Sequence, residues 1–447
     1  MKQTLSKILV FVFLFLCPVI SVSADDEMTY DPNATAESLG LEPYVLPTDF
    51  FPVYPWDWFP VEHLPYETME TSLPGNAECG FNFAGFVKPQ DLGRCDALGL
   101  KAMVPAQANW ANMTDEQIDV HIQGIVEKSK GHECVIGYYL IDEPGAKLFP
   151  ALGKAVAAVK KHAPGKIAYI NLFPRYATTD TVENPNSQLQ TRSFTEYLER
   201  YVQEVKPQFI SYDNYMVEYS DDMQDLGKAE VYYADLLQIR EIAQKYNLPF
   251  WNIVSCNRIQ GLTPPPSPAR FAFQAYTTLA AGGRGLGWFI YYHRNDFSHA
   301  PIDKEGRRTL SWLYLQAMNR QMTTLGPIMN RLESTGVYFT TPTPTPNLPE
   351  MPGKLVTKLD VTASPRKNID SVPPFMVGEF LGDDGCDYVM LVNLSLEYSA
   401  RFHMQTAKEY KNIVQISPMD GSESPIVTDD SGEWILPGHG LLLKLAR

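Results

Sequence analysis

The stretch "GYYLIDEPGA", residues 137–146, ends an apolar and aromatic run with two adjacent carboxylates, Asp142 and Glu143. A buried carboxylate costs free energy unless it is paired or has a function. Aromatic neighbours such as Tyr138 and Tyr139 raise the pKa of a carboxyl group by removing water from it. Glu143 therefore has the setting of a general acid that stays protonated near neutral pH.

Other apolar runs also end in polar or aromatic residues. Asp213 ends the sixth such run and is the predicted partner of Glu143, because glycosidic bond cleavage uses two carboxyl groups. Carboxylates, amides and aromatic rings suit a neutral, hydroxyl-rich ligand, so a carbohydrate is the expected substrate. The predicted substrate-binding residues are Asn82, Tyr139, Asn171, Tyr215, Asn257, Trp288 and Tyr291. We see no metal-ligand spacing and no glycine-rich phosphate loop, and we expect neither a metal ion nor a cofactor.

Eight short apolar segments alternate with amphipathic helical patterns, and they must position these residues. The segments are residues 50–56, 79–86, 101–106, 135–141, 167–173, 209–215, 250–256 and 285–292. This alternation predicts a (β/α)₈ TIM barrel over residues 47–334. Since catalytic groups of such barrels lie at the carboxyl ends of the strands, the polar residues above are expected to converge there.

The pattern changes after the barrel. The Pro- and Thr-rich stretch "TTPTPTPNLPEMPG" cannot be helical, and short strands separated by turns follow it. We therefore predict a small C-terminal antiparallel β-sandwich over residues 335–447.

The amino-terminal segment predicts export. Residues 1–24 combine a basic start, an apolar run and small residues before a cleavage site after Ala24, as in a signal peptide. Residues 25–46 are polar and are expected to form a flexible leader. We expect a secreted or periplasmic protein without membrane insertion.

In such a compartment, a disulfide between Cys79 and Cys134 is an available pairing. The formal net charge of −15 argues against a nucleic-acid partner.

The segments "GYYLIDEP", "FISYDNY", "WNIV" and "GWFIYY", in this order, resemble the glycoside hydrolase superfamily that includes the family-42 β-galactosidases. The resemblance implies that the acid/base glutamate ending the fourth strand is Glu143, although Asp142 stands where that superfamily usually has asparagine. It also implies a nucleophilic glutamate at the end of the seventh strand. The corresponding stretch "PFWNIVSCNR" contains no carboxylate.

Three interpretations therefore remain open. In the first, the chain is a secreted glycoside hydrolase in which Asp213 is the second carboxylate. In the second, the Asp142–Glu143 pair resembles that of family-20 and family-123 hexosaminidases, which implies that Asp142 orients a substrate acetamido group acting as the nucleophile. In the third, the barrel binds carbohydrate without cleaving it. Carboxyl groups about 5–5.5 Å apart would indicate a retaining enzyme, and about 6.5–9.5 Å an inverting one.

Overall fold

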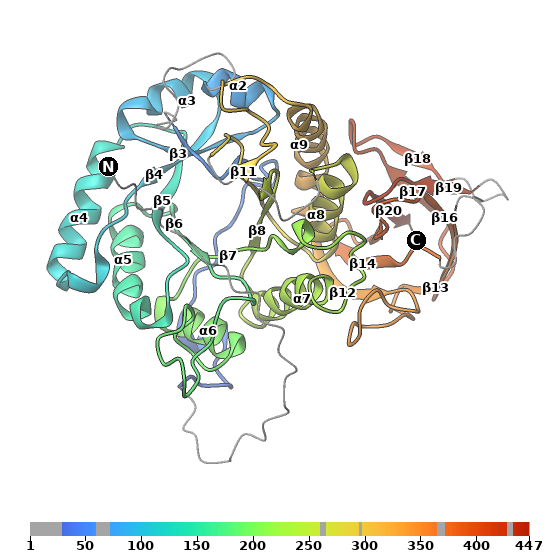
Figure 1. Cartoon of the computed structure of the whole chain (residues 1–447), viewed down its shortest axis with the longest axis horizontal. Coiled ribbons are helices and arrows are strands. Elements are labelled where there is room, and N and C mark those ends of the chain that lie inside the picture. The colour runs from blue at the N-terminus through green and yellow to red at the C-terminus, as the bar shows by residue number, and fades with distance from the viewer. Residues whose placement is uncertain are drawn as a thin grey trace, which may run out of the picture.

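The computed structural model describes residues 29–59, 72–259, 265–294, 297–363, 372–426 and 432–446. The predicted signal peptide lies outside these residues. Within them, a parallel nine-stranded sheet with the order β1-β10-β8-β7-β6-β5-β4-β3-β2 forms the first layer of the molecule, and helices surround it (Figure 1). The (β/α)₈ barrel followed by antiparallel sheets is confirmed.

The barrel strands coincide closely with the predicted segments. Their bounds are β1 Val53–Pro55, β2 Trp58–Phe59, β3 Phe83–Val87, β4 Lys101–Pro105, β5 Val135–Asp142, β6 Ile167–Leu172, β7 Ile210–Asp213, β8 Phe250–Ser255 and β10 Leu286–Phe289. The second predicted segment begins too early, because Cys79 directly follows a short helix and the strand starts at Phe83.

The first predicted strand closes the sheet because its two halves pair with opposite edges. β1 pairs with β10, and β2 pairs with β3. The amide of Phe86 also donates to the carbonyl of Asp57 across this junction. Gly85 permits the close approach: it has a φ of 79°, and a Cβ there would lie 2.6 Å from the carbonyl oxygen of Pro55.

Aromatic side chains fill the barrel interior. Tyr54, Tyr169 and Trp251 lie in one buried cluster, which alternate residues of the strands supply. Gly287 makes room for them, because a Cβ there would lie 2.8 Å from the ring of Tyr54. The residues between these inward positions point to the surrounding helices and form a second, larger cluster.

The helices follow from sequence signals that also fix their ends. Thr114 caps α4 through a capping box with Gln117, as the first-turn acids predict. The described helices of the barrel layer are α2 Leu73–Glu78, α3 Leu92–Leu98, α4 Asp115–Lys128, α5 Phe149–His162, α6 Phe194–Arg200, α7 Ala229–Lys245, α8 Pro268–Ala280 and α9 Leu310–Met329. A π-helical turn, η4 Tyr201–Val205, continues α6.

The C-terminal region packs two antiparallel sheets around its own apolar core. The strands are β12 Leu332–Phe339, β13 Val356–Ala363, β14 Phe375–Gly382, β15 Asp387–Asn393, β16 Ala400–Thr406, β17 Asn412–Ile416, β18 Glu423–Pro425, β19 Glu433–Ile435 and β20 Gly440–Ala446. The predicted domain boundary at residue 334 falls inside β12. Helix α8 joins the two parts: a Cβ at Gly378 would lie 2.3 Å from the carbonyl oxygen of Ala280.

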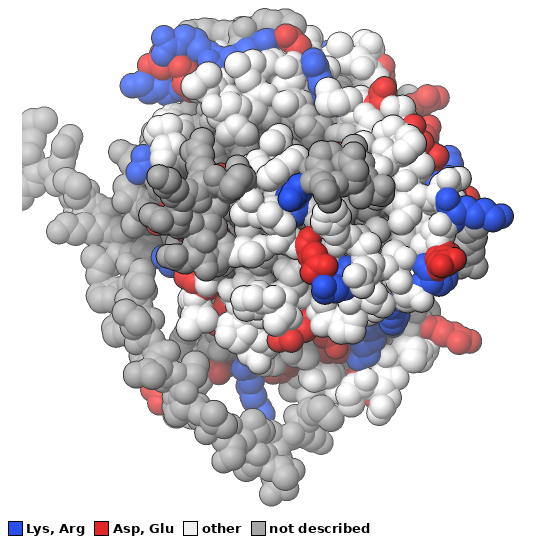
Figure 2. Space-filling model, turned by 90° about the vertical axis from the view of Figure 1, so that its right-hand side faces the viewer, with Lys and Arg blue, Asp and Glu red and all other residues white. Residues whose placement is uncertain are grey.

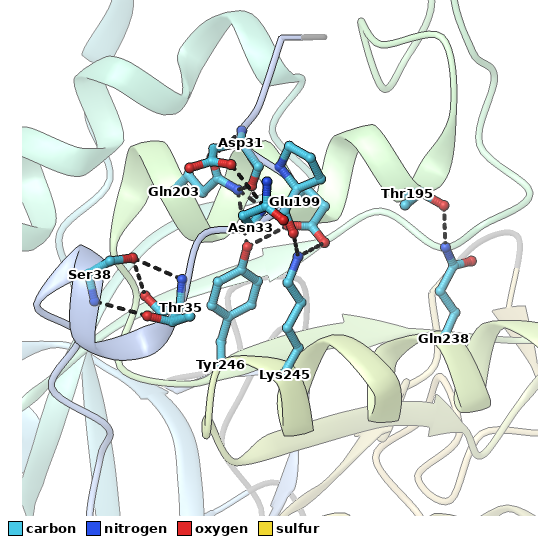
Figure 3. A network of polar contacts seen from close by, with 11 residues as sticks. Asp31, Asn33, Thr35, Ser38, Thr195, Glu199, Gln203, Gln238, Lys245 and Tyr246 are labelled. Carbon is cyan, nitrogen blue, oxygen red and sulfur yellow. Dashed lines mark hydrogen bonds and ion pairs between the residues drawn. The ribbon is translucent and has the colours of Figure 1, made fainter.

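The predicted flexible leader is instead held against the barrel over its described part, residues 29–46. Figure 3 shows its contacts with Gln203 of η4 and Lys245 of α7. Gln203 bonds Asp31 twice, at 2.9 Å and 2.8 Å. Lys245 donates to the carbonyl of Pro32 and, at 2.7 Å, to Glu199. Polarity along this segment therefore reflects specific hydrogen bonds to helices that are distant in sequence.

Two further predictions concern cysteines and surface charge. Cys79 and Cys134 are free and buried, so the disulfide between them is not formed. Figure 2 views the side of the C-terminal sandwich and shows acidic and basic side chains interspersed, with no field of one sign. Among the described residues, no helix has the length and apolarity needed to cross a membrane.

Candidate active site

Strand register brings three predicted residues to one level at the carboxyl end of the barrel. Asp142 on β5 pairs with Asn171 on β6, and Asn171 pairs with Ser211 on β7. Asp213 follows Ser211 by two residues and therefore shares its inward face. The Asn171 Nδ2 atom donates to both acids, at 2.7 Å to Asp213 and 3.1 Å to Asp142.

The backbone of Glu143 has an uncommon conformation. Its φ is 46°, in the left-handed region that non-glycine residues rarely adopt. Its amide donates to the carbonyl of Asn171 at 2.9 Å, which fixes the turn after β5. A strained backbone held in place by a neighbouring strand is typical of positions that aim a functional side chain.

Burial raises the pKa values of all three carboxyl groups, and the charge of Asp142 further raises those of the other two. Surrounding protein and the negative charge of Asp142 raise the pKa of Glu143 to about 7. Partial desolvation raises the pKa of Asp142 to about 6, although its side chain reaches solvent. Burial, and then the charges of Glu143 and Asp142, raise the pKa of Asp213 well above its ordinary value. A hydrogen bond with Asp213 acts in the opposite direction on Glu143 and lowers its pKa.

A buried hydrogen-bond chain fixes the orientation of the Asn171 amide. Ser211 Oγ donates its single hydrogen to Asn171 Oδ1 at 3.0 Å. Tyr169 must then donate to Ser211, at 2.6 Å, and Tyr54 must donate to Tyr169, at 2.7 Å. With Oδ1 occupied by a donor, the Nδ2 atom of Asn171 must face the two acids.

Aromatic rings border the acidic group. Tyr215 and Phe289 stack with ring centroids 5.0 Å apart, and both are half-buried. Tyr139 lies deeper and packs against the half-buried ring of Trp58. Asp142 and Glu143 are close enough to Tyr139 to contribute, after desolvation, to raising its pKa. The placements predicted for Tyr139, Asn171 and Tyr215 thus agree with the structure, and their role in substrate binding stays a prediction.

Three other predicted substrate-binding residues do not reach this site. Asn82 lies before β3, at the amino end of the barrel, where it bonds the backbone of Phe51 and Val53. Trp288 is fully buried and packs outward against Phe271 of α8. Alternation along β10 explains this, because its neighbours Gly287 and Phe289 take the inward positions.

Tyr291 is also buried away from the acids. Its hydroxyl accepts a hydrogen bond from Trp312 Nε1 of α9 at 2.9 Å. The predicted eighth strand ends at Phe289, so the chain turns before Tyr291.

Asn257 lies after the carboxyl end of β8, as predicted, but its oxygen is committed to the protein. Its Oδ1 atom accepts from the amide of Ile290 at 2.9 Å and so holds the loop that follows Phe289. Asp57 supports the same loop by accepting from the amides of Tyr291 and Tyr292 and from Arg294.

Sequence reasoning missed residues that support the site from a distance. Asp235 on α7 is fully buried and accepts from Asn214, the neighbour of Asp213, at 2.8 Å. Its sequence setting in an amphipathic helix gives no sign of this contact. Ser211 and Phe289 could have been found, because alternation from Asp213 and Gly287 places them on the inward face.

A solved structure agrees with the fold over most of both chains. A family 5 glycoside hydrolase from Bacteroides vulgatus ATCC 8482 aligns over 89% of each chain, with a TM-score of 0.53 and 12% identity. The β-galactosidase from the psychrophilic Marinomonas ef1 aligns over 64% of this chain and 63% of its own, with a TM-score of 0.48 and 9% identity. This chain therefore matches less than two thirds of that enzyme's length. No protein-family model and no curated protein sequence matches the chain.

The arrangement has the groups needed for acid/base chemistry on a polar substrate. It combines a carboxyl group protonated near neutral pH, a neighbouring carboxylate open to solvent and partly exposed aromatic faces. The β8 strand ends in Ser255, without a carboxylate. Within the residues that the structure describes, no group of His, Cys, Asp and Glu side chains has metal-binding geometry.

Proposed function

We propose that the protein is a glycoside hydrolase that cleaves O-glycosidic bonds with Glu143 as the general acid. The observation that carries this proposal is the position of Glu143, which follows β5 at the carboxyl end of the barrel, near Asp213 and beside the exposed Asp142. Raising the pKa of a carboxyl group to about 7 suits it to protonate a leaving-group oxygen.

We assign the second carboxylate from how near each acid lies to Glu143 and from how far solvent reaches it. Glu143 and Asp213 lie near each other: the charge of Glu143 raises the pKa of Asp213, and a hydrogen bond with Asp213 lowers that of Glu143. Asp213 is also only 2% exposed. These facts favour Asp213 as the proton-sharing partner of Glu143. Asp142, which Asn171 holds and solvent reaches, is then the group that assists the attacking nucleophile.

A second candidate is favoured by the same exposure of Asp142. With no carboxylate at the end of β8, an acetamido group of the substrate could supply the nucleophile and Asp142 could orient it. The substrate would then be an N-acetylhexosaminide. Binding of carbohydrate without cleavage is the remaining alternative, and the same experiment distinguishes all three.

The test is sugar release from polysaccharides and aryl glycosides, including N-acetylhexosaminides. We compare the mature protein with Glu143→Gln and with Glu127→Gln, a matched change on an exposed face of α4. Loss of about 10²–10⁴-fold in Glu143→Gln alone is expected. Equal turnover by all three proteins would remove Glu143 from the mechanism. Sugar binding without turnover would identify a binding protein, and turnover only of N-acetylhexosaminides would identify the second candidate.

We also propose export with cleavage after Ala24. The basic, apolar and small-residue pattern of residues 1–24 supports this assignment. Mass spectrometry of the protein isolated from the native host should find Asp25 as the first residue. Recovery of the chain with Met1 intact would contradict it.

A further inference from the structure

A cavity of about 510 Å³ lies at the opposite end of the barrel from the acidic site. Residues at the start of β8, the end of α7, the start of β12 and the segment 43–48 line it together. Its volume is within the range of small-molecule sites, which is about 300–1,000 Å³. Both parts of the chain contribute, so the cavity exists only in the assembled fold.

Two arginines with no acidic partner line this cavity. Among the described residues, neither Arg240 nor Arg284 lies in an ion pair with a carboxylate. Arg284 donates instead to the carbonyls of Met329 and Leu332. Arg240 donates through Nε and Nη2 to the hydroxyl of Ser334, at 3.3 Å and 3.1 Å.

The electrostatic balance of the lining is therefore positive. Burial lowers the pKa of Arg284 to about 10 and also lowers that of Arg240, but both stay protonated at neutral pH. Carbonyl and hydroxyl oxygens compensate a guanidinium less well than a carboxylate does. Glu333 is the acidic residue in the lining, and its side chain is exposed.

Asn330 also lines the cavity, but its side-chain oxygen is not accessible from it. Its Nδ2 atom donates to the carbonyl of Phe50 at 2.9 Å, while its Oδ1 atom is buried without a partner in the described structure. A ligand with an oxyanion group would meet the charge of Arg240, whose Nε and Nη2 atoms donate to a neutral hydroxyl.

We propose that this cavity is a binding site for a small oxyanion, in which the guanidinium of Arg240 contacts the anionic group. A small carboxylate such as a sugar acid has the size and the charge that suit this lining. Arg284 holds the turn between α9 and β12 and adds positive potential. The site is separate from the acidic group and does not depend on the proposed hydrolase activity.

Isothermal titration of the purified mature protein with glucuronate tests the proposal, with glucose, sulfate and phosphate as comparison ligands. Glucuronate should bind, glucose should not, and affinity should fall as salt concentration rises. Sulfate or phosphate binding would support a site for oxyanions in general, whereas glucose binding equal to that of glucuronate would overturn the role of the anionic group. Absence of any anion binding would overturn the whole proposal.

Two variants locate the binding and control for folding. Arg240→Gln should weaken glucuronate binding at least tenfold. Arg320→Gln makes the same charge change on an exposed part of α9 and should leave glucuronate binding unchanged. Glu333→Gln removes the negative charge from the lining and should strengthen binding, which a misfolded protein cannot imitate. Equal affinity in all three variants would contradict the assignment. Glu143→Gln should bind glucuronate like wild type, so this test is independent of catalysis.

Discussion

The side-chain nitrogen of Asn171 lies 2.7 Å from a carboxylate oxygen of Asp213, and the same nitrogen lies 3.1 Å from Asp142. One amide therefore links acids on two strands that flank its own. Because hydrogen bonds to a carboxylate stabilise its charged form, Asn171 limits how far burial and repulsion raise the pKa of each acid.

Asn171→Ala should lower kcat/KM about 10²-fold. Loss of the donor raises the pKa of both Asp142 and Asp213, so the acid limb of the pH profile should move to higher pH. The measurement is kcat/KM across pH, with Asn186→Ala in the exposed loop after β6 as the control. An unchanged acid limb would show that Asn171 does not tune these groups.

Ser211→Ala should lower kcat about tenfold while the protein remains folded. Without the Ser211 hydroxyl, the Asn171 amide can turn its oxygen toward the acids. Tyr169→Phe should have a smaller effect, and the double variant should resemble Ser211→Ala because both residues act through one chain. Tyr232→Phe removes a buried hydroxyl that bonds Thr277 in the helical layer, and serves as the control. If the effects of Ser211→Ala and Tyr169→Phe add in the double variant, the two residues do not act through one hydrogen-bond chain.

Activity should decline as pH rises through about 7. The pKa of Glu143 is raised to about 7, and only the protonated carboxyl can donate to a leaving group. Activity should also decline below about 6, where Asp142 becomes protonated. Measurement of kcat/KM against pH should therefore give a bell-shaped profile. The variant Asp142→Asn should lack the acid limb of this profile. A rate that keeps rising above about pH 8 would contradict Glu143 as the acid.

Asp235 should make the protein less stable at alkaline pH. Burial raises its pKa from 3.8 to about 7, so the native state keeps a proton that the unfolded state releases. Stability from this group is present below the unfolded pKa and is lost as pH rises through about 7. Urea unfolding measures the free energy of unfolding of both proteins. The difference between Asp235→Asn and wild type should shift by about 1–3 kcal/mol in favour of the variant between about pH 5 and about pH 8. Asp222→Asn on the surface should show no such gain, and an equal shift in both variants would refute the assignment.

Tyr215→Ala should raise KM about tenfold and change kcat little. Its ring stacks on Phe289 beside the acids, where a sugar face can pack against it, so its loss removes binding shared by ground state and transition state. Steady-state kinetics with a substrate that the sugar-release test identifies would measure this. Tyr398→Ala, an exposed ring on the sandwich, is the control. A fall in kcat with unchanged KM would assign Tyr215 to the chemical step instead.

The sequence by itself determined the eight barrel strands and the position of Glu143 at the end of the fourth. Short apolar runs with turns between them are local signals, and strand ends follow from where apolarity stops. The same signals placed Asp142, Asn171 and Asp213 at strand ends. They misplaced Trp288, because a strand buried on both faces gives no polar pattern to show which side chains point inward.

Only the tertiary structure decided which of these groups meet. The contact of Asn171 with two acids depends on the register of three strands, and the chain from Tyr54 to Ser211 crosses the barrel interior. Asp235 reaches the site from a helix, and residues 29–46 lie fixed on helices far away in sequence. Such contacts depend on barrel closure and helix packing. Register and packing are set by the complete core, so local patterns along the chain do not contain them.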